Sequence, residues 1–257
     1  MSVALHHELS GPADAPVLVL SGSLGTDLSM WDPQAQALSA RFRLLRYDQR
    51  GHGRSPVPRG PYSIAELGQD LLALLDRLEI DRALICGLSI GGMTGMWVAA
   101  HAPERVQRLV LLCTSALLGP AEMWRERAET VRTSGVEAIA DAGLERWFTE
   151  GFRRRSPEIV ARLRAALVAT PPEGYASCCE AIAAMDLRGD LASIATPTLV
   201  VSGADDPATP PEHGRRIADA VAGARFEVIG PAAHLASVEQ PERVTELILG
   251  FLNEEAV

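Results

Sequence analysis

A short stretch in the first half of the chain, residues 83–92, restricts the possible fold more than any other. An apolar run, Ala83–Cys86, leads into Gly87-Leu88-Ser89-Ile90-Gly91, and a helical pattern follows from Gly92 to His101. A Gly-x-Ser-x-Gly sequence between a strand and a helix is typical of a nucleophile elbow. Its glycines lack a Cβ, so strand and helix can approach a serine held on a strained turn. This context favours Ser89 as a nucleophile over the alternative, an ordinary glycine-rich turn.

The patterns on either side of this stretch alternate between strand and helix, which favours an α/β fold with a mostly parallel sheet. Residues 3–9 could form a short edge strand. Further strand patterns occur at residues 17–20, 43–48, 106–113, 197–201 and 225–229. The sequence Ser63-x-x-Glu66 is a capping box and predicts a helix that runs to about Leu78.

Residues 121–185 differ from the rest of the chain because their patterns are helical, with almost no strand signal. The strand type resumes at Pro197. We therefore expect one α/β core made of residues 1–115 and 191–257, interrupted by a helical cap over residues 116–190.

Composition excludes some classes of function. The chain has 257 residues and a formal net charge of −9, which argues against a nucleic-acid partner. An anionic small substrate remains compatible with this charge, because a pocket has its own local field. No apolar run approaches the roughly 20 residues that span a bilayer, and the first ten residues lack signal-peptide features. The four cysteines have no zinc-like spacing, which favours a reducing, cytoplasmic location.

A serine nucleophile needs a base and a third group that orients the base, and in α/β hydrolases these follow in the order Ser, Asp or Glu, His. Of the six histidines, His234 alone follows a strand pattern and precedes the last helix, although a surface-loop histidine is the alternative reading. The loop after the 197–201 strand offers Asp205 and Asp206. The spacing Gly203-x-x-Asp206-x-x-x-Pro210 favours Asp206 as the acid and leaves Asp205 as a turn residue.

Two backbone N–H groups should stabilise the oxyanion of a tetrahedral intermediate. One is expected from Ile90, the residue after the nucleophile, and the other from the loop Ser21–Thr26. Ser23 is the first choice in that loop and Leu24 the alternative. His52, in the sequence Arg-Gly-His-Gly, is expected to be structural rather than catalytic.

Four stretches of the chain resemble 3-oxoadipate enol-lactonases, a family of cytoplasmic α/β hydrolases. They are Ser21-Gly-Ser-Leu-Gly-Thr-Asp-Leu-Ser-Met-Trp31, Arg46-Tyr-Asp-Gln-Arg-Gly-His-Gly53, Cys86-Gly-Leu-Ser-Ile-Gly-Gly-Met-Thr-Gly-Met96 and Gly174-Tyr-Ala-Ser-Cys-Cys-Glu-Ala-Ile182. The likeness covers nearly the whole chain, cap included. One departure is Gly22, where many members have asparagine, and it affects the shape of the expected oxyanion loop.

The resemblance implies an α/β-hydrolase fold and a hydrolase that opens 3-oxoadipate enol-lactone to 3-oxoadipate, in the β-ketoadipate pathway of aromatic catabolism. It implies a Ser-His-Asp acyl-enzyme mechanism with no metal or organic cofactor. The expected partner is a small lactone that bears a carboxylate, with no nucleic acid and no membrane. The sequence makes no prediction of the oligomeric state.

A cation near the cap would help to orient the substrate carboxylate. From Ala121 onward, Trp124, Arg127, Ala128 and Val131 fall on one helix face. Trp124 and Arg127 are therefore the candidates for substrate binding, although an ordinary amphipathic helix with a solvated arginine explains the pattern equally well.

Three other functions fit the same residues. A small-ester esterase or a cofactor-free perhydrolase would use the same three catalytic groups. A ligand-binding receptor could also use this fold, because fold alone does not fix function. The presence of all three residue types in order argues against a receptor, since a binding protein needs no complete triad.

Overall fold

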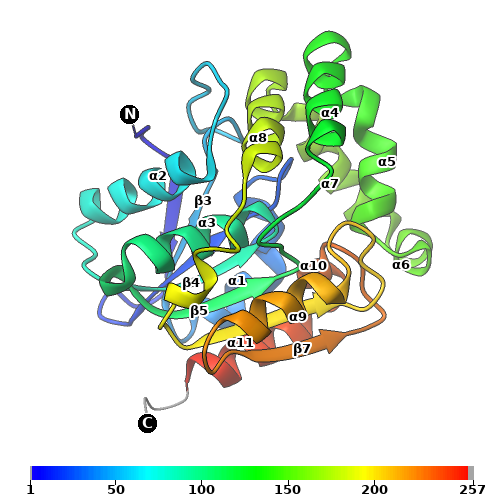
Figure 1. The fold of residues 1–257 in the computed structure, drawn as a ribbon. Coiled ribbons are helices and arrows are strands. Elements are labelled where there is room, and N and C mark those ends of the chain that lie inside the picture. The colour runs from blue at the N-terminus through cyan, green and yellow to red at the C-terminus, as the bar shows by residue number, and fades with distance from the viewer. Residues whose placement is uncertain (1, 254–257) are drawn as a thin grey trace.

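The computed structural model describes residues 2–253, which form a seven-stranded sheet flanked by helices, with a further group of helices at one end (Figure 1). The strands are β1 (His7–Ser10), β2 (Val17–Ser21), β3 (Arg43–Tyr47), β4 (Ala83–Leu88), β5 (Val106–Leu112), β6 (Thr198–Gly203) and β7 (Arg225–Ile229). Their order in the sheet is β1-β3-β2-β4-β5-β6-β7. Every pair is parallel except β1 with β3. The predicted α/β-hydrolase fold, a mostly parallel sheet with flanking helices, is confirmed.

The central strand, β4, is buried along its whole length, as its continuous apolar sequence predicts. Because the carboxyl ends of parallel strands meet at one edge, the loops after β2, β4, β6 and β7 lie at the same edge of the sheet. These loops carry Ser23, Ser89, Asp206 and His234, which the sequence analysis singled out.

The first strand is shorter than predicted, beginning at His7 rather than at Val3. Its register pairs His7 with Tyr47. The preceding backbone is used elsewhere, because the Val3 N–H donates to Asp70 Oδ1 (2.8 Å) and the His6 N–H donates to Ser55 Oγ (2.9 Å). These two bonds attach the N-terminal segment to side chains instead of to the sheet.

The helices of the core are α1 (Asp32–Ser39), α2 (Ile64–Arg77), α3 (Ile90–His101), α9 (Pro211–Ala220), α10 (Ala236–Glu239) and α11 (Pro241–Leu252). The predicted capping box of α2 is present. The Ser63 hydroxyl accepts from the Glu66 N–H (3.2 Å), and the Glu66 carboxylate accepts from the Ser63 N–H (3.0 Å). These bonds satisfy two backbone donors at the start of the helix.

Between β5 and β6 the described chain forms helices and no strand. They are α4 (Ala121–Ser134), α5 (Glu137–Trp147), α6 (Glu150–Arg155), α7 (Pro157–Ala169) and α8 (Pro172–Ala184). We refer to α4–α8 as the cap helices, and Figure 1 shows them gathered at one end of the molecule. Met1 and residues 254–257, which the predicted core includes, lie outside the described residues.

Candidate active site

Ser89 lies between β4 and α3 with φ +58° and ψ −119°, a conformation that non-glycine residues rarely adopt. The neighbouring glycines make this turn possible. A Cβ on Gly87 would lie 2.2 Å from the Gly91 carbonyl oxygen, and a Cβ on Gly91 would lie 2.3 Å from the Ser21 carbonyl oxygen. The strained turn places the serine at the N-terminus of α3, where backbone N–H groups have no partner within the helix.

The structure places Asp206 and His234 together in the loops after β6 and β7. His234 Nδ1 lies 2.9 Å from Asp206 Oδ2. Asp206 is buried and also accepts from the Ala208 N–H (2.8 Å), the Thr209 N–H (3.0 Å) and the Thr209 hydroxyl (2.6 Å). Because Asp206 occupies Nδ1, Nε2 is the imidazole nitrogen available to accept a proton.

The electrostatics around Asp206 favour an ionised carboxylate. Burial by itself would raise the pKa of Asp206, but the imidazole of His234 and the hydrogen bonds from His234 and Thr209 outweigh it, so the pKa is lowered. The neighbouring Asp205 lies differently. Its carboxylate accepts from the Ala232 N–H (3.2 Å), and its own N–H donates to the Ala232 carbonyl (2.9 Å). Asp205 thus joins the loop after β6 to the loop before His234.

Ser89 and His234 line one small cavity beneath the cap helices. Both side chains are buried, at 6% and 5% exposure. The three residues chosen from the sequence, Ser89, Asp206 and His234, are therefore brought to one place. Each comes from the loop that follows a different parallel strand.

The loop after β2 offers a different oxyanion donor from the one first chosen. The Ser23 N–H donates to Met30 Sδ (3.3 Å), and the Gly25 N–H donates to His52 Nε2 (2.9 Å). Within residues 2–253, the Leu24 N–H has no acceptor, and Leu24 lines the cavity beside Ser89. The geometry therefore argues against Ser23 and for Leu24, the alternative donor, to act with the Ile90 N–H at the start of α3.

Gly22, where an asparagine was expected, is held through its backbone. Its carbonyl accepts from Gln49 Nε2 (2.7 Å). A Cβ at this position would lie 3.0 Å from Thr26 Oγ1 and 3.1 Å from Met30 Sδ, so a larger side chain would have to displace one of them. Glycine thus fits a tight version of this loop, in which the Thr26 hydroxyl also donates to the Ser23 carbonyl (2.8 Å).

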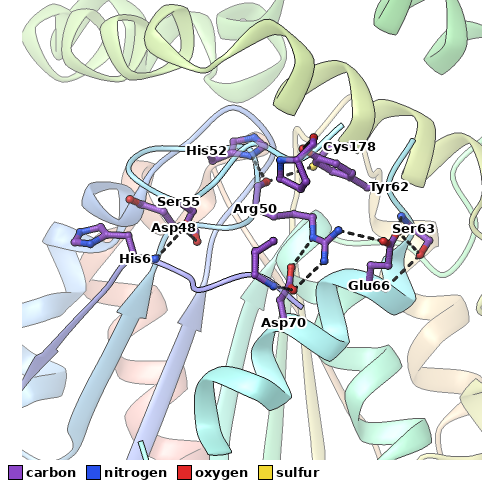
Figure 2. A network of polar contacts seen from close by, with 12 residues as sticks. His6, Asp48, Arg50, His52, Ser55, Tyr62, Ser63, Glu66, Asp70 and Cys178 are labelled. Carbon is purple, nitrogen blue, oxygen red and sulfur yellow. Dashed lines mark hydrogen bonds and ion pairs between the residues drawn. The ribbon is translucent and has the colours of Figure 1, made fainter. Parts of the chain in front are cut away.

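A polar network joins the loop after β3 to α2 (Figure 2). The Arg50 guanidinium donates to both carboxylate oxygens of Asp70, and to Glu66 (3.2 Å) at the start of α2. His52, on the same loop, uses Nδ1 toward the Arg50 carbonyl (3.2 Å) and Nε2 as the acceptor for the Gly25 N–H. His52 thereby fixes the oxyanion loop from behind, which matches its expected structural role.

Burial lowers the pKa of His52 from 6.5 to about 4. The folded protein keeps His52 neutral, so the unfolded chain binds one more proton between these two pH values. His52 has no effect on stability above pH 6.5. As the pH falls from 6.5 to 4, its protonation in the unfolded chain lowers the free energy of unfolding by about 3 kcal/mol in total. Glutamine can still accept the Gly25 N–H but does not titrate. We expect His52→Gln to lose less unfolding free energy than the wild type between pH 7 and pH 4.5 in urea titrations.

The exposed His101, which stacks on Trp97 at the end of α3, provides the control for this experiment. His101→Gln leaves His52 in place, so its unfolding free energy should still fall between pH 7 and pH 4.5. A His52→Gln variant whose stability falls with pH as steeply as that of the wild type would contradict the assignment of His52 as the buried titrating group.

The cavity wall opposite Ser89 comes from the cap helices. Trp124 and Arg127, both chosen from the sequence, line it, with the Arg127 guanidinium 4.5 Å from the centroid of the Trp124 ring. The buried Trp124 Nε1–H has no acceptor within the described residues. The indole N–H therefore remains available to a ligand, and the Arg127 guanidinium, which bonds the Tyr175 hydroxyl, lines the same cavity.

Arg146, at the end of α5, also lines this cavity and was not identified from the sequence. Burial, and next the like charge of Arg127, lower its pKa. Within residues 2–253, neither Arg127 nor Arg146 pairs with a carboxylate. Two half-buried cations without a counter-ion favour an anionic ligand. Only the packing of α4 beside α5 brings them together, so no local sequence pattern could have indicated Arg146.

None of the helices within residues 2–253 combines the length and apolarity that a membrane span requires. In the same range, no group of three or more His, Cys, Asp or Glu side chains is arranged to hold a metal ion.

Comparisons with known proteins agree with the fold. A family model described as alpha/beta hydrolase fold matches residues 15–136 and 147–241. The chain is 45% identical to 3-oxoadipate enol-lactonase 2 of Acinetobacter baylyi, over 93% of this chain and 90% of that protein. It is 33% identical to a protein of Stutzerimonas stutzeri named as a carbamate hydrolase, RutD, over 98% of this chain and 97% of that protein.

The crystal structure of the enol-lactonase from Burkholderia xenovorans LB400 superimposes with a TM-score of 0.96 at 48% identity, covering 97% of this chain and 96% of that one. The resemblance noted in the sequence therefore extends over the whole fold, cap helices included. This chain belongs to the 3-oxoadipate enol-lactonase family of α/β hydrolases and is an ester hydrolase.

Proposed function

We propose that this enzyme opens 3-oxoadipate enol-lactone to 3-oxoadipate, with Ser89 as nucleophile, His234 as general base and Asp206 as the residue that orients His234. The observation that carries the proposal is the shared cavity, in which Ser89 and His234 lie with two arginines that pair with no carboxylate of the described residues, Arg127 and Arg146. A lactone ester with a free carboxylate needs both a nucleophile and a cation.

In the first half of the reaction, His234 Nε2 takes the Ser89 proton as Oγ attacks the ring carbonyl carbon. The N–H groups of Ile90 and Leu24 stabilise the resulting oxyanion. When the intermediate collapses, the ring C–O bond breaks and the oxygen leaves as an enolate, which is a better leaving group than an alkoxide. It takes the proton from His234 and tautomerises to the ketone.

Because the ester is part of a ring, the leaving group stays attached to the acyl chain, and the acyl-enzyme carries every atom of the substrate. Water then attacks the Ser89 ester while His234 accepts its proton. Collapse of the second intermediate returns the proton to Ser89 and releases 3-oxoadipate. In this scheme the protein side chains and water carry every step, in a cytoplasmic route of aromatic catabolism (the β-ketoadipate pathway). Residues 116–190 act as a cap that contributes the substrate-binding wall.

The relatives named above include both lactone and carbamate hydrolases, so the bond that this enzyme cleaves has to be tested by comparing its activity on different substrates. We expect kcat/KM for the enol-lactone to exceed that for a neutral aryl ester and for a neutral carbamate by orders of magnitude. Turnover of aryl esters alone would defeat the substrate assignment and favour a small-ester esterase. Peracid formation from acetate and hydrogen peroxide, with no lactone opening, would favour a perhydrolase.

Arg127→Ala and Arg146→Ala should each raise KM for carboxylate-bearing substrates by about 10- to 100-fold, because each removes a charge-assisted hydrogen bond. A matched pair of substrates isolates the charge. The 4-nitrophenyl ester of glutaric acid has a free carboxylate, and the 4-nitrophenyl ester of valeric acid has a methyl group in its place. Neither variant should change KM for the valerate appreciably.

Arg125 serves as the control for these variants. It lies on α4, as Arg127 does, but it is exposed and pairs with Glu122. Arg125→Ala should leave KM for both esters unchanged. Equal effects of Arg127→Ala or Arg146→Ala on the two esters would remove that arginine from the carboxylate site.

A further inference from the structure

The corner between α5 and α6 is joined by hydrogen bonds to the loop that carries His234. The His234 N–H donates to the Arg146 carbonyl (3.4 Å), and the Leu235 N–H donates to the Trp147 carbonyl (2.9 Å). The backbone of a proposed substrate-binding residue is thus bonded directly to the backbone of the proposed base. One part of the cap is therefore fixed to the catalytic loop.

Glu239, the last residue of α10, completes this connection through a buried side chain that is 5% exposed. Its Oε1 accepts from the Ala233 N–H (2.8 Å) and from the Thr149 N–H (3.1 Å). Its Oε2 accepts from the Thr149 hydroxyl (2.7 Å). One carboxylate thereby holds the residue before His234 and the residue before α6.

The Glu239 carboxylate is unusual because no arginine pairs with it within residues 2–253, and the chain has no lysine. Burying a carboxylate is costly unless hydrogen bonds or a cation compensate for the lost water. Here the compensation comes from three donors, and all three belong to the cap corner or to the His234 loop. Breaking the connection would leave a buried charge with unsatisfied lone pairs, so the two segments are held together strongly.

We propose that Glu239 is a positioning residue, which keeps the Arg146 guanidinium and the His234 imidazole at one fixed spacing. A substrate held at its carboxylate by Arg146 then presents its ester carbonyl at the correct distance from the catalytic groups. Small errors in such placement slow the reaction, and a displacement of about 1 Å can lower the rate about 100-fold. The proposal rests on the proposed function, because it takes Arg146 as a contact of the substrate carboxylate.

Two variants weaken the hydrogen bond between the Thr149 hydroxyl and the Glu239 carboxylate, one by changing the donor and the other by changing the acceptor. Thr149→Val removes the hydroxyl that donates to Glu239, and Glu239→Gln removes the second acceptor oxygen while keeping the side-chain shape. Thr149→Ser retains the hydroxyl and is the conservative control. Because Thr149 also caps α6 by accepting from the Phe152 N–H (3.2 Å), agreement between Thr149→Val and Glu239→Gln is needed to exclude an effect on the cap alone.

The test compares kcat and KM on the glutarate and valerate esters, corrected for the fraction of active sites by titration with a fluorophosphonate. We expect both variants to lower kcat on the glutarate ester on the order of tenfold, with a much smaller loss on the valerate ester. In an Arg146→Ala background this extra loss should disappear, because the substrate is no longer held at that corner. Thr149→Ser should behave as wild type.

Equal losses on the two esters, or a loss that persists unchanged in the Arg146→Ala background, would overturn the proposal and show that the connection only stabilises the fold. These outcomes are separable from a failure of the proposed function. Wild-type turnover of the enol-lactone is measured independently, and the glutarate–valerate comparison does not depend on it.

Discussion

Ser89→Ala should reduce ester and lactone hydrolysis by at least about 10⁴-fold, because only the oxyanion donors and substrate binding would remain. Alanine removes one oxygen atom and fits the space that Ser89 occupies. The strained backbone at φ +58° is set by Gly87 and Gly91 rather than by the serine side chain. The fold should therefore survive, and the loss should appear in kcat with little change in the unfolding transition.

A second serine provides a matched control for this variant. Ser115 Oγ lies 2.7 Å from His213 Nδ1, so a serine–histidine pair also exists away from the elbow. Ser115 Oγ further bonds the Leu117 carbonyl (2.6 Å) at the entry to the cap helices, and it does not line the cavity with Ser89. Ser115→Ala should retain near-wild-type activity. Loss of activity in Ser115→Ala, with activity retained in Ser89→Ala, would reverse the assignment.

Asp206→Asn is the second large effect that we expect, with kcat lower by about 10⁴-fold. The Asp206 carboxylate accepts the proton of His234 Nδ1, which leaves Nε2 able to take the Ser89 proton. An asparagine can turn its NH₂ group toward Nδ1, which stabilises the tautomer with its proton on Nε2. That tautomer cannot act as a base toward Ser89. The lowered pKa of Asp206 means that the wild-type carboxylate is ionised at neutral pH.

Asp205→Asn is the control, because an asparagine oxygen can still accept the Ala232 N–H that Asp205 accepts now. We expect its activity to stay within about tenfold of wild type, the effect of a loop hydrogen bond that is largely retained. Steady-state kinetics with the enol-lactone measures both variants. If Asp205→Asn were the inactive variant and Asp206→Asn the active one, the sequence-based choice between the two would be wrong.

The parts of the fold and site that could be predicted from the sequence are those encoded locally. The elbow is a five-residue pattern, and its two glycines are required by contacts below 2.5 Å that any Cβ would make. His234 and Asp206 could be selected because the order of strands limits which loops reach the carboxyl edge of a parallel sheet. The capping box of α2 needs only four residues.

The parts that could not be predicted depend on packing between distant segments. The choice between Ser23 and Leu24 turns on where one N–H points, and Met30, seven residues from Ser23, decides it. Arg146 reaches the cavity because α4 and α5 converge on it. Glu239 reads as an ordinary polar residue before Gln-Pro, and only its burial against Thr149 gives it a role.

Labelling with a fluorophosphonate tests the nucleophile most directly, because this reagent forms a stable bond to an activated serine. We predict that the intact mass of the wild type rises by one phosphonyl group, that peptide mapping places it on Ser89, and that Ser89→Ala takes up none. The substrate lactone should slow the labelling by competing for the same cavity. A label on Ser115 or on any other residue, in an enzyme that opens the lactone, would contradict the account.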